Sequence, residues 1–155
     1  MIIMTRILPF FIAAIVLFAC GTTQQINPNQ LIVTTIQTGN LYGAGDEVFK
    51  QSVRVIHSIE EWHNLVKELG KVNVFETDFD PHTFDFEHKR LFFCTDSVRN
   101  SGGYSLSVSN GVVMNNKTIV HVNIQSPQGT VAEVITQPYI LFSMNKKGEI
   151  EVLFK

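Results

Sequence analysis

The sequence predicts a mainly β fold with one α-helix: an antiparallel β-sandwich or rolled sheet with the helix packed on one side. Two observations lead to this fold class. Short segments rich in Val, Ile, Phe and Thr recur from residue 31 to residue 155, and residues that favour turns separate them. Helical spacing of apolar residues is clear in one place, residues 58–70.

The first segments of the predicted domain are strand-like. Residues 31–37 (LIVTTIQ) are rich in β-branched side chains, and residues 40–47 (NLYGAGDE) break the pattern with two glycines. Residues 48–58 (VFKQSVRVIHS) are a second strand candidate, with Val53 and Val55 at its apolar positions.

One helix is predicted at residues 59–69. Ser58 and Glu61 match the S-x-x-E capping box, in which each side chain accepts a hydrogen bond from the other residue's backbone N–H. Gly70 ends the run. The apolar residues after the cap have helical spacing and predict one buried stripe: Ile59, Trp62, Leu65, Val66 and Leu69. We expect Trp62 to anchor this stripe in the core. An exposed ligand platform is the alternative.

The remainder of the chain is β-rich after an acidic, irregular stretch at residues 72–89. A buried type of strand is predicted at residues 90–97 (RLFFCTDS), and alternating strands follow it. The further strand candidates are residues 104–110, 118–125, 131–136, 139–144 and 149–154. Hairpin turns are predicted at residues 115–117 (NNK) and 145–148 (NKKG).

The N-terminus has the pattern of an export signal. Arg6 is the one charged side chain before Asp46, and the apolar run at residues 7–18 is too short to span a bilayer. Residues 17–20 (LFAC) resemble a bacterial lipobox, which implies cleavage before Cys20 and a lipid on its sulfur. An ordinary signal peptide is the alternative. The protein is therefore expected in the bacterial cell envelope, anchored in a membrane by its lipid. The sequence leaves open which leaflet it uses.

These boundaries divide the chain into three parts. Residues 1–19 are the expected signal peptide, residues 20–30 an uncharged polar tether, and residues 31–155 a single domain. Lipidation of Cys20 would leave Cys94 without an intramolecular disulfide partner. The formal net charge of −2 gives no reason to expect nucleic acid, which favours a basic surface.

No motif in the sequence predicts catalysis or a cofactor. Residues 100–104 (NSGGY) lack the serine between glycines of a nucleophile elbow, and Cys94 lies inside an apolar run with no activating neighbour. Five potential ligands fall within eleven residues, but their spacing is not that of a known metal motif: Asp78, Asp80, His82, Asp85 and His88. We expect a solvated acidic loop there and no metal, and ion binding stays an open alternative.

Four segments in a fixed order resemble the C-terminal domain of the PrcB protease complex subunit family. They are the helix at residues 59–69, DFEHKRLFF at 85–93, SGGYSLSV at 101–108 and SPQG…TQPYILFSM at 126–144. The resemblance spans residues 48–145. It implies a lipoprotein that accompanies and stabilises a secreted protease and is not itself a catalyst. The family's motif residues map to Ser101, Gly102, Gly103, Tyr104, Gln137, Pro138 and Tyr139.

A second resemblance competes with the first. Chagasin-like inhibitors of cysteine proteases are Ig-like sandwiches that present three loops at one end. The first of these loops ends in a Thr-Gly-aromatic element, and the last carries a Pro-aromatic pair. NSGGY and QPY occur here in that order, but the inhibitors' threonines and glycine-rich middle loop have no good match.

The sequence therefore predicts a lipid-anchored, non-enzymatic domain that acts through protein contact, with a protease as one possible partner. Loops on a rigid scaffold are where binding residues usually lie. We expect Tyr104 to face the core and residues 99–102 to be exposed. The predicted partner-binding residues come from two turns that should meet at one end of the domain: Arg99, Asn100, Ser101, Gly102, Gly103, Tyr104, Gln137, Pro138 and Tyr139.

Overall fold

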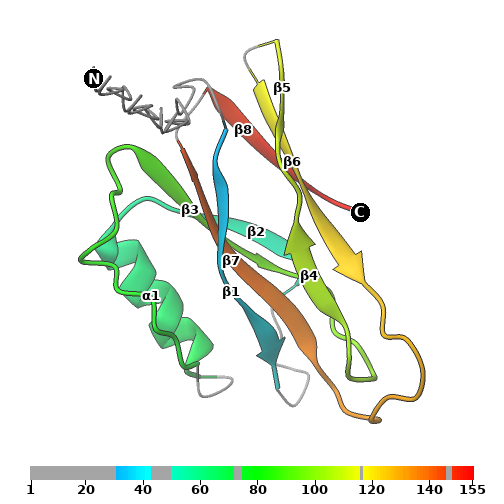
Figure 1. The fold of residues 1–155 in the computed structure, drawn as a ribbon. Helices are drawn as coiled ribbons and strands as arrows, with labels where there is room; N and C mark the ends of the chain where they lie inside the picture. The colour runs from blue at the N-terminus through cyan, green and yellow to red at the C-terminus, as the bar shows by residue number, and fades with distance from the viewer. Residues whose placement is uncertain (1–30, 43–49, 72–74, 116, 146–147) are drawn as a thin grey trace, which may run out of the picture.

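A computed structural model of the chain describes residues 31–42, 50–71, 75–115, 117–145 and 148–155 (Figure 1). Cys20, the expected signal peptide and the tether lie outside these residues. Within the described residues there are eight strands and one helix: β1 (Val33–Leu41), β2 (Ser52–Ile56), α1 (Ile59–Leu69), β3 (Lys89–Thr95), β4 (Ser105–Val108), β5 (Val112–Met114), β6 (Lys117–Gln125), β7 (Gln137–Asn145) and β8 (Glu149–Phe154). No helix in this part of the chain is long and apolar enough to cross a bilayer.

The strands form two sheets. The first has the order β1-β7-β3-β2, and all of its pairs are antiparallel. In the second, β4 and β5 pair along β6 in antiparallel fashion, and β8 pairs with β6 in parallel. Helix α1 lies on one side of the first sheet, and the second sheet lies on the other (Figure 1). The predicted mainly β fold, with two packed sheets and one helix on one side, is confirmed.

The central strands β3 and β7 are buried on both faces. Leu91 and Leu141 belong to the cluster that packs against α1, whereas Phe92 and Phe142 belong to the cluster between the sheets. The rings of Phe92 and Phe142 stack with centroids 5.0 Å apart. A strand with apolar neighbours on both faces needs apolar residues at successive positions. This is why the two segments read as continuous apolar runs.

The helix begins and ends where its capping and spacing predicted. Ser58 Oγ accepts a hydrogen bond from the Glu61 backbone N–H at 3.2 Å. The Glu61 carboxylate, however, accepts from the backbone N–H of His57 at 2.8 Å, so the return bond of the predicted capping box reaches one residue further back. Trp62 is only 2% exposed and packs edge-on against Phe79, which confirms its role in the core.

Two local predictions were wrong, and one strand was missed. Residues 131–136 are not a strand: apart from the isolated bridge of Thr136 to Arg99 they pair with no described strand, and residues 132–135 are exposed. Residues 145–148 do not close a hairpin, since β7 and β8 lie in different sheets and β8 pairs with β6 instead. Strand β5 was not predicted. The turn at residues 115–117 is confirmed, and it joins β5 to β6 through Asn115 at φ 48°.

Candidate protein-interaction surface

The predicted loop at residues 99–102 meets the segment that leads into β7, residues 132–136, which had been predicted to be a strand. Arg99 and Thr136 form an isolated antiparallel bridge, in which each backbone N–H donates to the other's carbonyl oxygen, at 2.7 and 3.0 Å. The Thr136 hydroxyl donates to the Ser101 carbonyl oxygen at 3.1 Å. The Gly102 N–H donates to the Ala132 carbonyl oxygen at 2.9 Å. Residues 99–102 and 132–136 therefore form one connected pair of loops.

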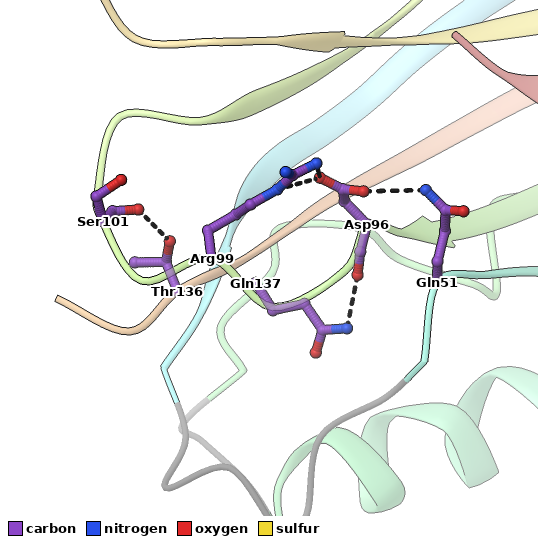
Figure 2. A network of polar contacts seen from close by, with 6 residues as sticks. All are labelled: Gln51, Asp96, Arg99, Ser101, Thr136 and Gln137. Carbon is purple, nitrogen blue, oxygen red and sulfur yellow. Dashed lines mark hydrogen bonds and ion pairs between the residues drawn. The ribbon is translucent and has the colours of Figure 1, made fainter.

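A buried carboxylate holds this pair of loops to the first sheet. Asp96 directly follows β3 and has no exposed surface. One of its oxygens accepts from Arg99 Nε at 2.8 Å and Nη2 at 2.5 Å, and the other accepts from Gln51 Nε2 at 3.0 Å (Figure 2). Gln137 Nε2 donates to the Asp96 carbonyl oxygen at 2.7 Å. A buried charge is tolerated when it is paired and fully hydrogen-bonded, so these contacts fix the loop geometry.

Arg99 is held from a second side by an aromatic ring. Its Cζ lies 4.7 Å from the centroid of Tyr104, a cation–π arrangement. Tyr104 precedes β4 and is half-buried beneath the guanidinium instead of lying in the core. The Arg99 side chain keeps 29% of its surface exposed. Arg99 and Tyr104 thus support the loop more than they offer groups to a partner.

Three predicted contact residues are internal. Gln137, Pro138 and Tyr139 are all buried in β7, so the prediction that they touch a partner was wrong. The Tyr139 ring covers Gly39, where a Cβ would lie 2.8 Å from the ring, and its hydroxyl accepts from Gln37 Nε2 at 2.7 Å. Burial raises the pKa of Tyr139. Because both faces of β7 are covered, residues 137–139 support the loop from inside the domain and are not available to a partner.

The two adjacent glycines have a packing reason. Gly103 adopts φ 83°, and a Cβ there would lie 2.8 Å from Pro127 Cβ. A Cβ at Gly102 would lie 3.3 Å from Val134 Cγ1. Glycine permits both the positive φ and the close approach, so the pair lets residues 102–103 lie directly against residues 127–134.

What remains exposed at this end is partly apolar. We call it the loop-end surface and define it as Val98, Asn100, Gly103, Val134 and Ile135. Val98, Val134 and Ile135 are 37%, 38% and 47% exposed. Sequence reasoning missed Val134 and Ile135 because residues 131–136 were predicted to be a strand, and it missed Val98 because that residue falls between the predicted strand at 90–97 and the predicted contact residues that begin at Arg99.

Cys94 and the acidic stretch at residues 78–88 were the other candidate groups. Burial raises the pKa of the Cys94 thiol to about 12, which disfavours the reactive thiolate at neutral pH. Among the described residues, no three His, Cys, Asp or Glu side chains are grouped to hold a metal ion. In the acidic stretch, one carboxylate oxygen of Asp80 accepts from His82 N–H, and one of Asp85 accepts from Glu87 and His88 N–H. These carboxylates shape local turns.

An open groove of about 700 Å³ lies between β1 and residues 76–84. Phe79 and Phe84 line it, together with the exposed residues Glu76, Asp78 and Asp80. Its two rings belong to the packing around Trp62. The groove is therefore a boundary of the helix-side core and not part of the loop-end surface.

The fold and the site together define a small β domain of two sheets with one helix against the first sheet. Buried polar contacts hold its exposed loops in place. Residues 96–145 match the family model described as PrcB C-terminal, so this part of the chain is similar to that domain. This confirms the predicted resemblance over a shorter span than expected: the match begins at Asp96 and ends with β7. It contains the whole loop-end surface. No curated protein and no solved structure matches the chain.

Proposed function

We propose that this protein is a lipid-anchored, non-enzymatic accessory subunit of the bacterial cell envelope that binds a protease through the loop-end surface. The association with a protease rests on the PrcB C-terminal match at residues 96–145. The observation that carries the proposal is that Val98, Val134 and Ile135 are exposed on loops which buried hydrogen bonds hold in place. A preorganised apolar patch loses little conformational entropy on binding.

The direction of the anchor supports the same assignment. Cys20 lies eleven residues before Leu31, where the described domain begins. Strand β1 starts at the end of the domain that also carries the β5–β6 turn, and the loops lie at the opposite end (Figure 1). The nine residues of β7 separate the two ends by about 30 Å. A lipid on Cys20 would therefore attach to the domain at the end opposite the loop-end surface.

The chagasin-like inhibitor has less support. That alternative needs the Gln137–Tyr139 segment as an exposed loop, and these residues are buried in β7. In addition, β6 and β8 pair in parallel, whereas Ig-like sandwiches are built from antiparallel sheets.

Affinity capture of the acylated protein from its native membrane tests the proposal. Captured proteins are identified by mass spectrometry, and we expect a protease among them. Ile135→Arg adds a charge to the loop-end surface and should lower the protease yield strongly, whereas Thr34→Arg, on an exposed position at the start of β1, should leave it unchanged. Equal yields from both variants would show that the interface lies elsewhere. Recovery of partners that include no protease would contradict the protease assignment.

A further inference from the structure

Strand β5 carries exposed apolar side chains on both of its faces. Val112, Val113 and Met114 are 54%, 55% and 57% exposed. Successive side chains of a strand point to opposite faces, so neither face of β5 is covered. Among the described strands β5 pairs with β6, and the hairpin extends past the start of β1 (Figure 1). This arrangement leaves β5 outside the core that the two sheets share.

The chain enters the domain beside this strand. Leu31 packs against the cluster between the sheets, and a Cβ on Gly111 would lie 2.3 Å from Leu31 Cδ2. Gly111 immediately precedes β5, so the first described residue and the exposed strand are neighbours. Ile32, the next residue, is 43% exposed. We call Ile32, Val112, Val113 and Met114 the tether-end patch.

We propose that the tether-end patch is a membrane-contact site that rests on the surface of the bilayer in which the Cys20 lipid is embedded. The inference depends on the lipid anchor of the proposed function. The eleven residues from Cys20 to Leu31 reach at most about 40 Å, which places the bilayer surface within range of the patch. An anchored chain keeps the patch close to lipid throughout its lifetime, which is the reason to assign lipid as the occupant.

The contact should be shallow and apolar. An unpaired strand edge keeps backbone N–H and C=O groups that need water or headgroups, so β5 belongs at the interface and not in the hydrocarbon core. Lys117 pairs with Met114 in the β5–β6 hairpin, and its Nζ lies 3.5 Å from a Glu149 carboxylate oxygen and 3.1 Å from one of Glu151. Because its charge is balanced, attraction to anionic lipid should contribute little. Binding should therefore be independent of salt and of anionic lipid content.

Site-specific fluorescence quenching tests this directly. The acylated full chain carrying Val113→Cys is labelled with an environment-sensitive dye and placed in phosphatidylcholine vesicles that contain nitroxide-headgroup lipid. Cys94 is fully buried and should not react, and the sulfur of Cys20 is occupied by its lipid. Asn100→Cys, an exposed position on the loop-end surface, is the matched control. Met114→Cys serves as a second probe if the first variant does not fold.

We expect the label at position 113 to lose most of its emission and the label at position 100 to lose almost none. The loss should not change with added NaCl or with anionic lipid. Equal quenching at both positions, or a loss that salt abolishes, would overturn the inference. A signal at position 113 that depends on protein density and not on nitroxide would show that a second copy covers the patch, and would overturn it too. Acyl mass on Cys20 is measured in the same preparation: its absence contradicts the anchor and with it this inference, whereas an acylated chain without selective quenching contradicts the inference alone.

Discussion

The two ends of this domain expose apolar residues in different ways. At the loop end, Val134 and Ile135 lie on loops that a buried carboxylate, Asp96, connects to the sheet through Arg99 and Gln137. At the tether end, Val112, Val113 and Met114 lie on a short strand that projects beyond the core.

This difference matches the two kinds of contact that we propose, one with a protein and one with a bilayer. Loops with internally satisfied polar groups have one shape, which suits a partner with a complementary surface. A projecting strand with apolar residues on both faces does not present one surface of fixed shape to a partner. It is better suited to a lipid bilayer, whose surface can adapt to it. The prediction is that substitutions beneath the loop end change stability strongly, whereas substitutions in the tether-end patch change it little.

Asp96→Asn should have the largest effect. It removes the buried charge that pairs with Arg99, and loss of one partner of a buried pair typically costs about 3–5 kcal/mol. Because the Arg99 side chain still reaches solvent, we expect a loss of about 3 kcal/mol in the free energy of unfolding, measured by urea denaturation. Lys117→Gln at the tether end is the matched control and should leave the denaturation midpoint unchanged. Equal midpoints for the two variants would remove the contrast between the ends.

Alkaline pH should lower the free energy of unfolding through Cys94, which lies two residues before Asp96. Burial raises the pKa of the Cys94 thiol from 9.0 to about 12, so the folded protein keeps a proton that the unfolded chain releases above pH 9. The contribution of this thiol to stability is therefore complete below pH 9 and is lost as the pH rises towards about 12. At pH 11 the loss should reach about 2–3 kcal/mol. Cys94→Ala should show a shallower decline between pH 8 and 11, and parallel curves would contradict the assignment.

Comparing Gln137→Arg with Asn100→Arg should distinguish the buried residues that support the loop end from the exposed residues on its surface. The Gln137 side chain is buried and donates to the Asp96 carbonyl oxygen, so its replacement should cost about 1–3 kcal/mol. Asn100→Arg changes an exposed residue of the same end and should stay within about 0.5 kcal/mol. Thermal unfolding of both variants makes the comparison. If Gln137→Arg is as stable as Asn100→Arg, Gln137 does not support the loops.

The smallest effect on stability is expected at β5. Replacing Val112, Val113 and Met114 together with serine removes side chains that are more than half exposed, so the free energy of unfolding should change by no more than about 0.5 kcal/mol. The same variant should bind vesicles less closely in the quenching assay with a label at Ile32→Cys. A large loss of stability would mean that β5 is part of the core.

Local signals in the sequence predicted local structure well. The helix needed only a capping residue, a 3.6-residue period and Gly70, all of which lie within its own segment. The buried strands β3 and β7 were visible as uninterrupted apolar runs. Residues 99–101 were predicted to lie near Gln137 and Pro138 because both segments carry residues with restricted or permissive backbones, and the contact falls one residue earlier, at Thr136.

Pairings between distant segments could not be predicted in this way. Nothing near β8 indicates that it pairs in parallel with β6 and not with the strand before it. Burial of Pro138 depends on β1 and β3 lying on either side of β7, which is a property of the assembled sheet. Asp96 was overlooked as a buried group because an aspartate after a strand usually faces water. The available clue was Arg99, a residue of opposite charge three positions after Asp96.

Burial of β7 on both faces has a consequence for the unfolded chain. Residues 139–144 (YILFSM) combine β-forming and apolar side chains with no charge and no proline, which is the composition of segments that assemble into intermolecular β-structure. In the folded domain β1 and β3 occupy both hydrogen-bonding edges of this segment. Pro138, which cannot donate a backbone hydrogen bond, stands at its entrance as a natural interruption. Substitutions that loosen the contacts around Asp96, at the edge of this sheet, should therefore favour pairing of β7 between chains.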